Sequence, residues 1–212
     1  MKRSRSGFGN YTAYYTKKRL VHCKEDHRVN QLHGEWFKGK RCLDVGCNSG
    51  KFTLQLSHTH GCCFIRGIDI DPLLIEEANL HSYDSVEFLV GDFTDLNPEE
   101  ENYDAITMMS VTKWIHLNHG DDGLVRVFNK VFRMLVPGGY FIVEPQPWPS
   151  YRNHRKDTST TATYFKEIQM YPKSFSDVLQ SEVGFILIMA IQPHPDQKKG
   201  FQRPILVFRK PP

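Results

Sequence analysis

The chain has 212 residues, and its 27 Lys and Arg against 24 Asp and Glu give a formal net charge of +3, which permits a nucleic-acid partner without requiring one. Hydrophobic residues make up 40% and charged residues 24%, proportions that are typical of a folded domain and exclude wholesale disorder. The five cysteines do not suit a disulfide scaffold and favour a reducing compartment; no apolar run reaches the roughly 18 residues of a membrane span, and the basic start predicts no secretion signal.

Strand-like and helix-like segments alternate along most of the chain. We expect residues 1–39, which are polar, aromatic and basic, to form an N-terminal arm that contributes to the binding sites of a domain over residues 40–212. Short apolar runs predict strands over residues 41–45, 63–70, 86–90, 103–109 and 140–143. Amphipathic spacing predicts helices over residues 51–57, from residue 71, over 121–135 and over 172–179.

Local signals mark the ends of two of these helices. Asp71 suits an N-cap, and Pro72 suits the first helical position. Apolar residues recur at every third or fourth position between 124 and 135. We expect Asp121 to cap that helix and Pro137-Gly138-Gly139 to end it.

The last third of the chain departs from the alternation. Residues 145–172 are first Pro-rich, then basic, then rich in Thr and Ser, and they predict an insertion. The apolar runs 185–191 and 205–208 flank a polar turn and predict an antiparallel hairpin. The whole pattern indicates an α/β, Rossmann-like fold with a mainly parallel seven-stranded sheet, helices on both faces and this C-terminal hairpin.

The turn after the first predicted strand contains Gly46, Cys47 and Asn48, and it is the first candidate site, because ligands of open α/β sheets bind beyond the carboxyl ends of the strands. Its G-x-x-x-G spacing differs from the dinucleotide pattern G-x-G-x-x-G, which disfavours a dehydrogenase. About 20 residues later, Asp69 and Asp71 could each accept hydrogen bonds from ribose hydroxyls. Since Asp71 is explained as a helix cap, we assign the ribose to Asp69.

Two further strand ends carry compatible groups. Asp92 follows the third predicted strand and could bind an adenine amino group, or serve only as a turn former, while Phe93 packs nearby. Met109 and Ser110 end the fourth strand beside the same cleft. The arrangement resembles that of class I S-adenosylmethionine-dependent methyltransferases, and this resemblance implies S-adenosyl-L-methionine as the cofactor.

Three longer strings are far more specific than the glycine turn. They are S-V-T-K-W-I-H-L-N-H-G-D at 110–121, E-P-Q-P-W at 144–148 and K-G-F-Q-R-P at 199–204. On these strings, together with G-N-Y-T-A-Y-Y at 9–15, the chain resembles the methylphosphate-capping RNA methyltransferases of the bicoid-interacting type. The similarity runs from about residue 8 to the C-terminus, nearly the whole chain.

The resemblance implies an enzyme that methylates a terminal 5′ phosphate of a small non-coding RNA. Two branches of the family differ in the phosphate that they use. The segments 44–50 and 115–121 resemble the branch that acts on 5′-monophosphates, whereas 9–15, 33–37 and 199–204 resemble the branch that caps the γ-phosphate of small nuclear RNAs. The predicted final hairpin favours the γ-phosphate, and the monophosphate stays the alternative.

The resemblance also implies roles for single residues. Arg28 would pair with the methionine carboxylate of the cofactor through its guanidinium fork. Lys113 would hold the RNA phosphate, and Tyr14 would donate a hydrogen bond to it. Apart from the resemblance, His116 could orient the remaining phosphate oxygens, or it could be a helix-start residue that faces the core. The implied cofactor-binding residues are Tyr15, Arg28, Gly46, Cys47, Asn48, Asp69, Ile70, Asp92, Phe93 and Met109.

Basic and aromatic residues that flank the cleft predict RNA contacts, because phosphates attract Lys and Arg and unpaired bases stack on aromatic rings. The candidates are Tyr11, Lys18 (or a basic neighbour), Trp148 and Arg152. We expect RNA as the partner of a monomeric catalytic unit, no membrane association, and a nuclear rather than cytoplasmic location.

Other interpretations keep part of this picture. A small-molecule methyltransferase would share every cofactor feature, and a non-catalytic RNA-binding protein would share the fold and the RNA surface. A metal site near His58, His60, Cys62 and Cys63 is not predicted, because no C-x-x-C pair exists and a free cysteine is commonly a small buried hydrophobe.

Overall fold

The computed structural model describes residues 7–9, 14–15, 25–97, 102–195, 197 and 199–212. The strands are β1 Arg41–Val45, β2 Phe64–Asp69, β3 Val86–Val90, β4 Tyr103–Met109, β5 Leu135–Glu144, β6 Ile186–Ile191 and β7 Ile205–Arg209. The helices are α1 His27–Gln31, α2 Lys51–His60, α3 Pro72–Asn79, α4 Thr112–Met134, α5 Trp148–His154, α6 Ser159–Glu167 and α7 Phe175–Val178. Short helical turns lie at Gly34–Trp36, Pro172–Ser174, Leu179–Val183 and Lys199–Phe201.

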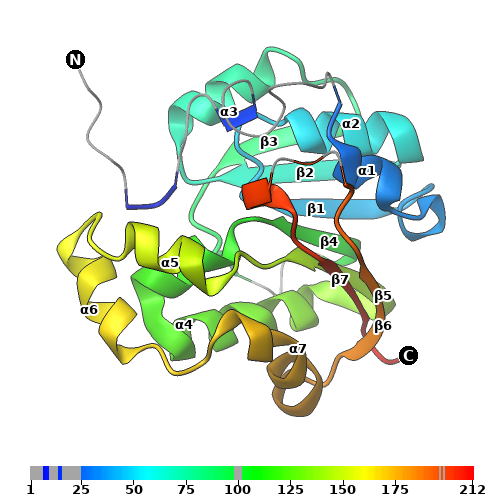
Figure 1. Ribbon diagram of the computed structural model, residues 1–212. Helices are drawn as coiled ribbons and strands as arrows, with labels where there is room; N and C mark the ends of the chain where they lie inside the picture. The colour runs from blue at the N-terminus through cyan, green and yellow to red at the C-terminus, as the bar shows by residue number, and fades with distance from the viewer. Residues whose placement is uncertain (1–6, 10–13, 16–24, 98–101, 196, 198) are drawn as a thin grey trace.

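The seven strands form one sheet in the order β3-β2-β1-β4-β5-β7-β6. The first five strands are parallel, and β7 pairs antiparallel with both β5 and β6. Helices α1, α2 and α3 cover one face of the sheet, and α4 with α7 covers the other (Figure 1). The predicted fold class is therefore confirmed, including the antiparallel end of the sheet.

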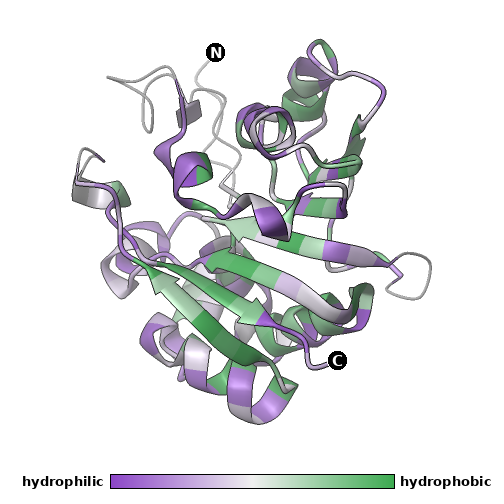
Figure 2. Cartoon of the chain, turned by 90° about the vertical axis from the view of Figure 1, so that its right-hand side faces the viewer, coloured by the Kyte–Doolittle hydropathy of each residue, from purple (hydrophilic) through white to green (hydrophobic). Residues whose placement is uncertain are grey.

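The central strands are buried on both faces, because successive side chains of a strand point in opposite directions. In β5, Phe141 and Val143 join the core beneath α4, while Ile142 joins the core beneath α2. In β1, Leu43 and Cys42 divide between the same two cores. Figure 2 shows the result as apolar strands between helices whose outer faces are polar. Burial of this kind, at about 25 cal/mol per Å² of apolar surface, is the main stabilising contribution to such a layered domain.

The local signal at Asp71 is confirmed. Its side chain accepts a hydrogen bond from the backbone N–H of Leu73, and Pro72 occupies the first turn of α3. Both observations follow from the unpaired N–H groups that every helix start exposes.

The predicted start at Asp121 matches the start of the second of two helical segments in α4, but the first segment was not predicted and the predicted cap is wrong. Helix α4 begins at Thr112, and its one non-helical residue is Gly120, with φ of 67° and ψ of −172°. The glycine interrupts the helix, so the apolar periodicity that begins after it concealed the earlier turns. The Asp121 carboxylate does not cap α4: it accepts hydrogen bonds from the backbone N–H groups of Gln169 and Met170.

The segment over residues 145–172, predicted as an insertion, folds into α5 and α6. Helix α6 packs against α4, and Thr158 and Thr161 form a reciprocal capping box at its start. The predicted helix over 172–179 is a 3₁₀ turn followed by α7. The division between an arm ending at residue 39 and a domain from residue 40 stays a prediction. In the part of the chain that the structure describes, no helix combines the length and apolarity needed to cross a bilayer.

Candidate active site

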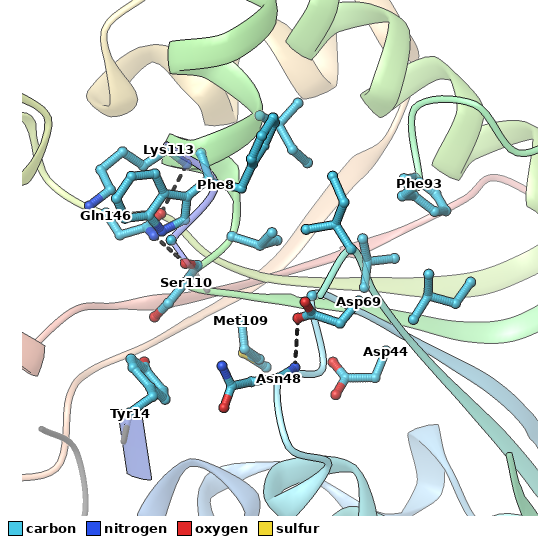
Figure 3. Close-up of a pocket in the computed structure, with 18 of the residues that line it drawn as sticks. Phe8, Tyr14, Asp44, Asn48, Asp69, Phe93, Met109, Ser110, Lys113 and Gln146 are labelled. Carbon is cyan, nitrogen blue, oxygen red and sulfur yellow. Dashed lines mark hydrogen bonds between the residues drawn. The ribbon is translucent and has the colours of Figure 1, made fainter. Parts of the chain in front are cut away.

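A cavity opens beyond the carboxyl ends of β1, β2, β3 and β4 (Figure 3). Many of the predicted site residues line it. They are Tyr14, Tyr15, Gly46, Asn48, Asp69, Ile70, Asp92, Phe93, Met109 and Lys113. In Figure 3, Asp69 and Phe93 lie toward one end of this cavity, and Lys113, Gln146 and Ser110 lie toward the other.

The turn after β1 has a backbone that a ligand can approach closely. Gly46 has φ of +75°, and a Cβ atom at this position would lie 2.6 Å from Cγ2 of Val111. Asn48 also adopts positive φ, at 53°, a conformation that asparagine tolerates better than most residues. Its backbone N–H donates to Asp69 Oδ2 over 2.8 Å, which fixes the turn to the end of β2.

The Asp69 carboxylate faces the cavity between two backbone donors. Besides the bond from Asn48, its Oδ1 accepts from the backbone N–H of Asp71 over 3.0 Å. Burial raises the pKa of Asp69, and the bonds from the Asp71 and Asn48 N–H groups oppose that shift. The side chain is therefore held in a fixed orientation as an acceptor for ligand hydroxyls.

A second carboxylate, Asp44 in β1, lines the same end of the cavity although the sequence reasoning did not select it. It is 2% exposed and accepts hydrogen bonds from the hydroxyls of Thr53, over 2.6 Å, and Thr107, over 2.7 Å. Burial raises its pKa, while these two bonds lower it. Its position next to the end of the first predicted strand was the signal that could have found it.

Asp92 has the predicted turn-forming geometry and lies at the cavity. Its Oδ1 accepts from the backbone N–H and the hydroxyl of Thr94, both over 2.8 Å, which is the turn-forming geometry, and the residue also lines the cavity. The Lys130 ammonium of α4 donates to the carbonyl oxygens of Phe93 and Thr94, over 2.9 and 2.6 Å. This loop is therefore anchored from the helix below it.

Lys113 lies at the opposite end of the cavity, at the start of α4. It is 3% exposed, and its Nζ donates to Ser150 Oγ over 3.1 Å and lies 3.9 Å from the Trp114 ring centroid. Gln146 fixes the turn that carries it: the side-chain carbonyl of Gln146 accepts from the Lys113 N–H over 3.1 Å, and its amide donates to the Ser110 carbonyl. The ammonium is therefore at the cavity and not in the apolar core.

Two tyrosines bring the N-terminal segment to the cavity. Tyr14 packs edge-on against Tyr15, with ring centroids 5.1 Å apart, and against Phe201, at 5.9 Å. Tyr15 is buried, and this burial raises the pKa of its hydroxyl well above the ordinary value. The Tyr15 phenol therefore stays protonated at neutral pH.

Two predicted cofactor residues lie outside the cavity lining. Arg28 is 1% exposed, and its guanidinium pairs with Asp26, over 2.6 Å, and with Glu144, over 2.9 Å. Cys47 is also buried, and its side chain joins the core beneath α2. Both of these partners of the Arg28 guanidinium are therefore carboxylates of the protein itself, and Cys47 offers the cavity at most its backbone.

His116 also lies away from the cavity. It is fully buried, its Nε2 is 2.6 Å from Asp121 Oδ1, and its Nδ1 is 3.2 Å from the Tyr151 hydroxyl. Burial lowers the pKa of this imidazole, and the bond to Asp121 opposes that shift. Because Asp121 also holds the backbone after α6, His116 joins α4 to the insertion and does not face a ligand.

The predicted RNA contacts are spread over several places. Trp148 packs against Phe165, with ring centroids 4.8 Å apart, as part of the small core between the insertion and α4, and it does not line the cavity. Arg152 is exposed on α5. Tyr11 and Lys18 lie outside the described residues.

Several cavity residues came from strings that the sequence singled out without assigning them a role. Ser110, Trp114 and His119 belong to the string 110–121, Gln146 to 144–148, and Phe201 and Arg203 to 199–204. Ser150 and His154 come from the insertion, and Phe8 and Gly9 from the N-terminal segment. Only the folded chain brings these segments to one place.

The charges that line the described cavity are separated. The carboxylates of Asp44, Asp69 and Asp92 come from β1, β2 and the turn after β3, and we call this the carboxylate end. The cations Lys113 and Arg203, with His119 and His154, come from α4, α5 and the segment before β7, and we call this the cationic end. One cavity therefore offers acceptors for hydroxyls at one end and positive charge for an anion at the other.

Comparison with known families agrees with this arrangement. The family model described as bicoid-interacting protein 3 (Bin3) matches residues 103–210, and a model described as a methyltransferase domain matches residues 43–143. The chain belongs to the Bin3 family. The predictions of the family and of an enzyme of the methyltransferase class are confirmed.

Two of the relatives extend over nearly all of this Bin3 chain, and a third over about half of it. A probable RNA methyltransferase of Arabidopsis thaliana is 36% identical over 96% of this chain and 80% of the relative. A U6 snRNA methylphosphate capping enzyme of Drosophila melanogaster is 34% identical over 96% of this chain and 74% of the relative. An RNA 5′-monophosphate methyltransferase of Rattus norvegicus is 34% identical over 52% of this chain and 47% of the relative.

Solved structures support the fold. The N-methyltransferase NodS of Bradyrhizobium japonicum, in complex with S-adenosyl-L-homocysteine, aligns with a TM-score of 0.67 over 97% of this Bin3 chain and 95% of that chain. Its sequence identity is 16%, so the likeness concerns the fold alone.

Proposed function

We propose that this Bin3 protein is an RNA 5′-phosphate methyltransferase that transfers a methyl group from S-adenosyl-L-methionine to the terminal γ-phosphate of a small non-coding RNA. The observation that supports it best is the charge separation within one cavity. A cationic methyl donor with ribose hydroxyls suits the carboxylate end, and a phosphate suits the cationic end.

The residues present fit the cofactor. The open backbone at Gly46, where a Cβ atom would collide with Val111, and the fixed carboxylate of Asp69 suit the close approach of a nucleoside and its ribose. Phe93 and Met109 supply apolar surface for the base. When bound, S-adenosyl-L-methionine supplies an electrophilic methyl group.

The residues at the cationic end orient the nucleophile. A phosphate oxygen is already anionic at neutral pH, because the second pKa of a phosphate monoester is about 6, so no strong general base is required. Lys113 binds and aligns the phosphate, and Tyr14 donates a hydrogen bond to it. The Ser150 hydroxyl accepts a hydrogen bond from the Lys113 ammonium and thereby helps to orient it. His116 contributes by joining α4 to the insertion, because its ring does not reach the cavity.

The relatives support the γ-phosphate over the monophosphate. The snRNA capping enzyme of the fly aligns over 96% of the chain, whereas the monophosphate methyltransferase of the rat aligns over 52%. The first alignment is therefore long enough to include both the N-terminal segment and the K-G-F-Q-R-P string. The same relative supports a nuclear location, and we propose a monomeric catalytic unit with Tyr11, Lys18, Trp148 and Arg152 as further RNA contacts.

The test uses one RNA sequence with a 5′-triphosphate, a 5′-monophosphate or a 5′-hydroxyl end, and a labelled methyl donor. We expect label on the triphosphate RNA that is released together with the γ-phosphate. Label on the monophosphate RNA alone would move the protein to the other branch. Absence of label on every RNA, although the cofactor binds, would contradict RNA methylation and favour a small-molecule substrate.

A further inference from the structure

Arg203, which precedes β7, enters the cavity from a part of the chain remote from Lys113. It is 9% exposed, and its guanidinium carbon lies 5.1 Å from the Phe201 ring centroid. Its Nη1 donates to Ser110 Oγ over 3.0 Å, and its Nη2 donates to the Gly200 carbonyl over 2.9 Å. The guanidinium therefore has a defined orientation at the cationic end.

The hydroxyl that holds Arg203 is itself fixed from several directions. Ser110 has φ of +64°, an unusual conformation for a residue other than glycine, of the kind that folded proteins retain mainly at functional sites. Its hydroxyl donates to Glu144 Oε2, its N–H donates to the Glu144 carbonyl, and its own carbonyl accepts from the Gln146 amide. Ser110 can therefore hardly move without disturbing the end of β5.

A buried ion pair fixes Glu144 in turn. Glu144 is fully buried and pairs with Arg28, which also pairs with Asp26. The negative charge of Glu144 is thus shared with the Arg28 guanidinium, and the Ser110 hydroxyl stands between Glu144 and Arg203. The Ser110 hydroxyl thereby fixes the guanidinium of Arg203 in the lining of the cavity.

We propose that Arg203 binds the 5′ phosphates of the RNA together with Lys113. A guanidinium is permanently charged and offers its N–H groups in a planar fork that matches phosphate oxygens, whereas the Lys113 ammonium acts as a compact charge. Two cations from different elements suit a chain of phosphates better than a single ammonium does. The inference rests on the proposed function, since it requires a phosphorylated RNA end in this cavity.

The test measures the dissociation constants of one RNA sequence with a 5′-triphosphate end and with a 5′-hydroxyl end. The ratio of the hydroxyl constant to the triphosphate constant gives the contribution of the phosphates to binding. Arg203→Gln should lower this ratio about tenfold, the usual size of a lost charge-assisted hydrogen bond. The affinity for the hydroxyl RNA and for the cofactor should not change. Arg209→Gln is the matched control, because Arg209 lies exposed at the far end of β7, and its ratio should equal that of the wild type.

Two further variants cover the case in which Arg203→Gln does not fold. Arg203→Lys keeps the charge without the fork, and Ser110→Gly suits the positive φ while it removes the hydroxyl that orients Arg203. Both should lower the ratio by less than Arg203→Gln does. An unchanged ratio in these variants, or an equal loss for both RNAs, would overturn the assignment. A wild-type protein that does not distinguish the two RNAs would instead contradict the proposed function itself.

Discussion

The carboxylate end and the cationic end of the cavity come from different halves of the sheet. Asp44, Asp69 and Asp92 belong to β1, β2 and the turn after β3, on one side of the sheet order, whereas Lys113 follows β4 and Arg203 precedes β7 on the other side. Lys113 and Arg203 are 90 positions apart in the sequence, and the antiparallel pairing of β7 with β5 brings the segment before β7 to the same cavity. The carboxylate end is built from strands and the turns that follow them, and the cationic end depends on contacts between residues far apart in the sequence.

This difference has a physical origin. Parallel strands present their carboxyl ends at one edge of the sheet, so any polar residue at a strand end faces the same crevice. The cations depend in addition on contacts between segments, because Ser150 helps to orient Lys113 and Ser110 helps to orient Arg203. We therefore expect cofactor binding to depend mainly on the alternation of strands and helices along the chain, and substrate binding to depend on tertiary contacts within the protein.

Removal of the Lys113 ammonium tests the cationic end most severely. We expect Lys113→Ala to lower methyl transfer about 100-fold, because a preorganised charge at the reacting group is lost. Cofactor affinity, measured by calorimetry, should not change, since Lys113 and Asp69 lie at opposite ends of the cavity. Lys166→Ala, at an exposed position of α6, is the control. Full activity of Lys113→Ala would remove this residue from the mechanism.

The complementary change addresses the carboxylate end. Asp69→Ala should weaken cofactor binding about 10- to 100-fold, the range for a lost hydrogen bond to a charged group, while turnover at saturating cofactor is largely kept. Calorimetric titration and steady-state rates separate the two effects. Unchanged affinity would contradict a ribose contact at Asp69, and an equal loss of turnover would show that the two ends do not act independently.

The third prediction concerns the turn after β1, where a side chain at position 46 would meet both backbone strain and a collision. Gly46→Ala should lower the free energy of unfolding by about 1 to 3 kcal/mol through backbone strain, and the collision with Val111 adds to this cost. Gly39→Ala is the matched control, because Gly39 has φ of +69° but its Cβ would meet no atom within 4 Å. Thermal unfolding of both variants should therefore show the greater loss for Gly46→Ala; equal losses would contradict a tightly packed turn.

The smallest expected effect concerns the junction between α4 and the insertion. Burial lowers the folded-state pKa of His116, so the unfolded chain binds the proton more readily. The contribution to stability is present above the ordinary His pKa of about 6.5 and is lost as the pH falls through the lower folded-state value. We expect the melting temperature of the wild type to fall between pH 7 and pH 5.5 more steeply than that of His116→Asn. Parallel profiles would show that His116 does not titrate in this way.

Much of the fold could be predicted because its signals are local. The Asp71-Pro72 pair marks the start of α3, and the strands at residues 41–45, 86–90 and 103–109 end as predicted. The start of α4 was missed because Gly120 interrupts its periodicity. The spacing of apolar residues shows where one helical segment lies, but it does not show that a second segment precedes it across the bend at Gly120.

The candidate site divides in the same way. Gly46, Asn48 and Asp69 could be placed from their positions at strand ends, and the cavity contains them. Arg28 and His116 could not be placed, because their charge and ring chemistry would suit a ligand as well as they suit Glu144 and Asp121. The type of a polar residue does not reveal whether its partner is a substrate or another residue of the protein.

The sequence by itself determined the alternation of strands and helices, the glycine turn and the strings typical of the Bin3 family, because these depend on neighbouring residues. The tertiary structure decided which charges face the cavity and which are neutralised inside the protein. It buried Arg28 between two carboxylates and brought Arg203 to Ser110. The reason is that pairing between charges depends on distance in space, and the antiparallel return of β7 sets that distance for residues far apart in the chain.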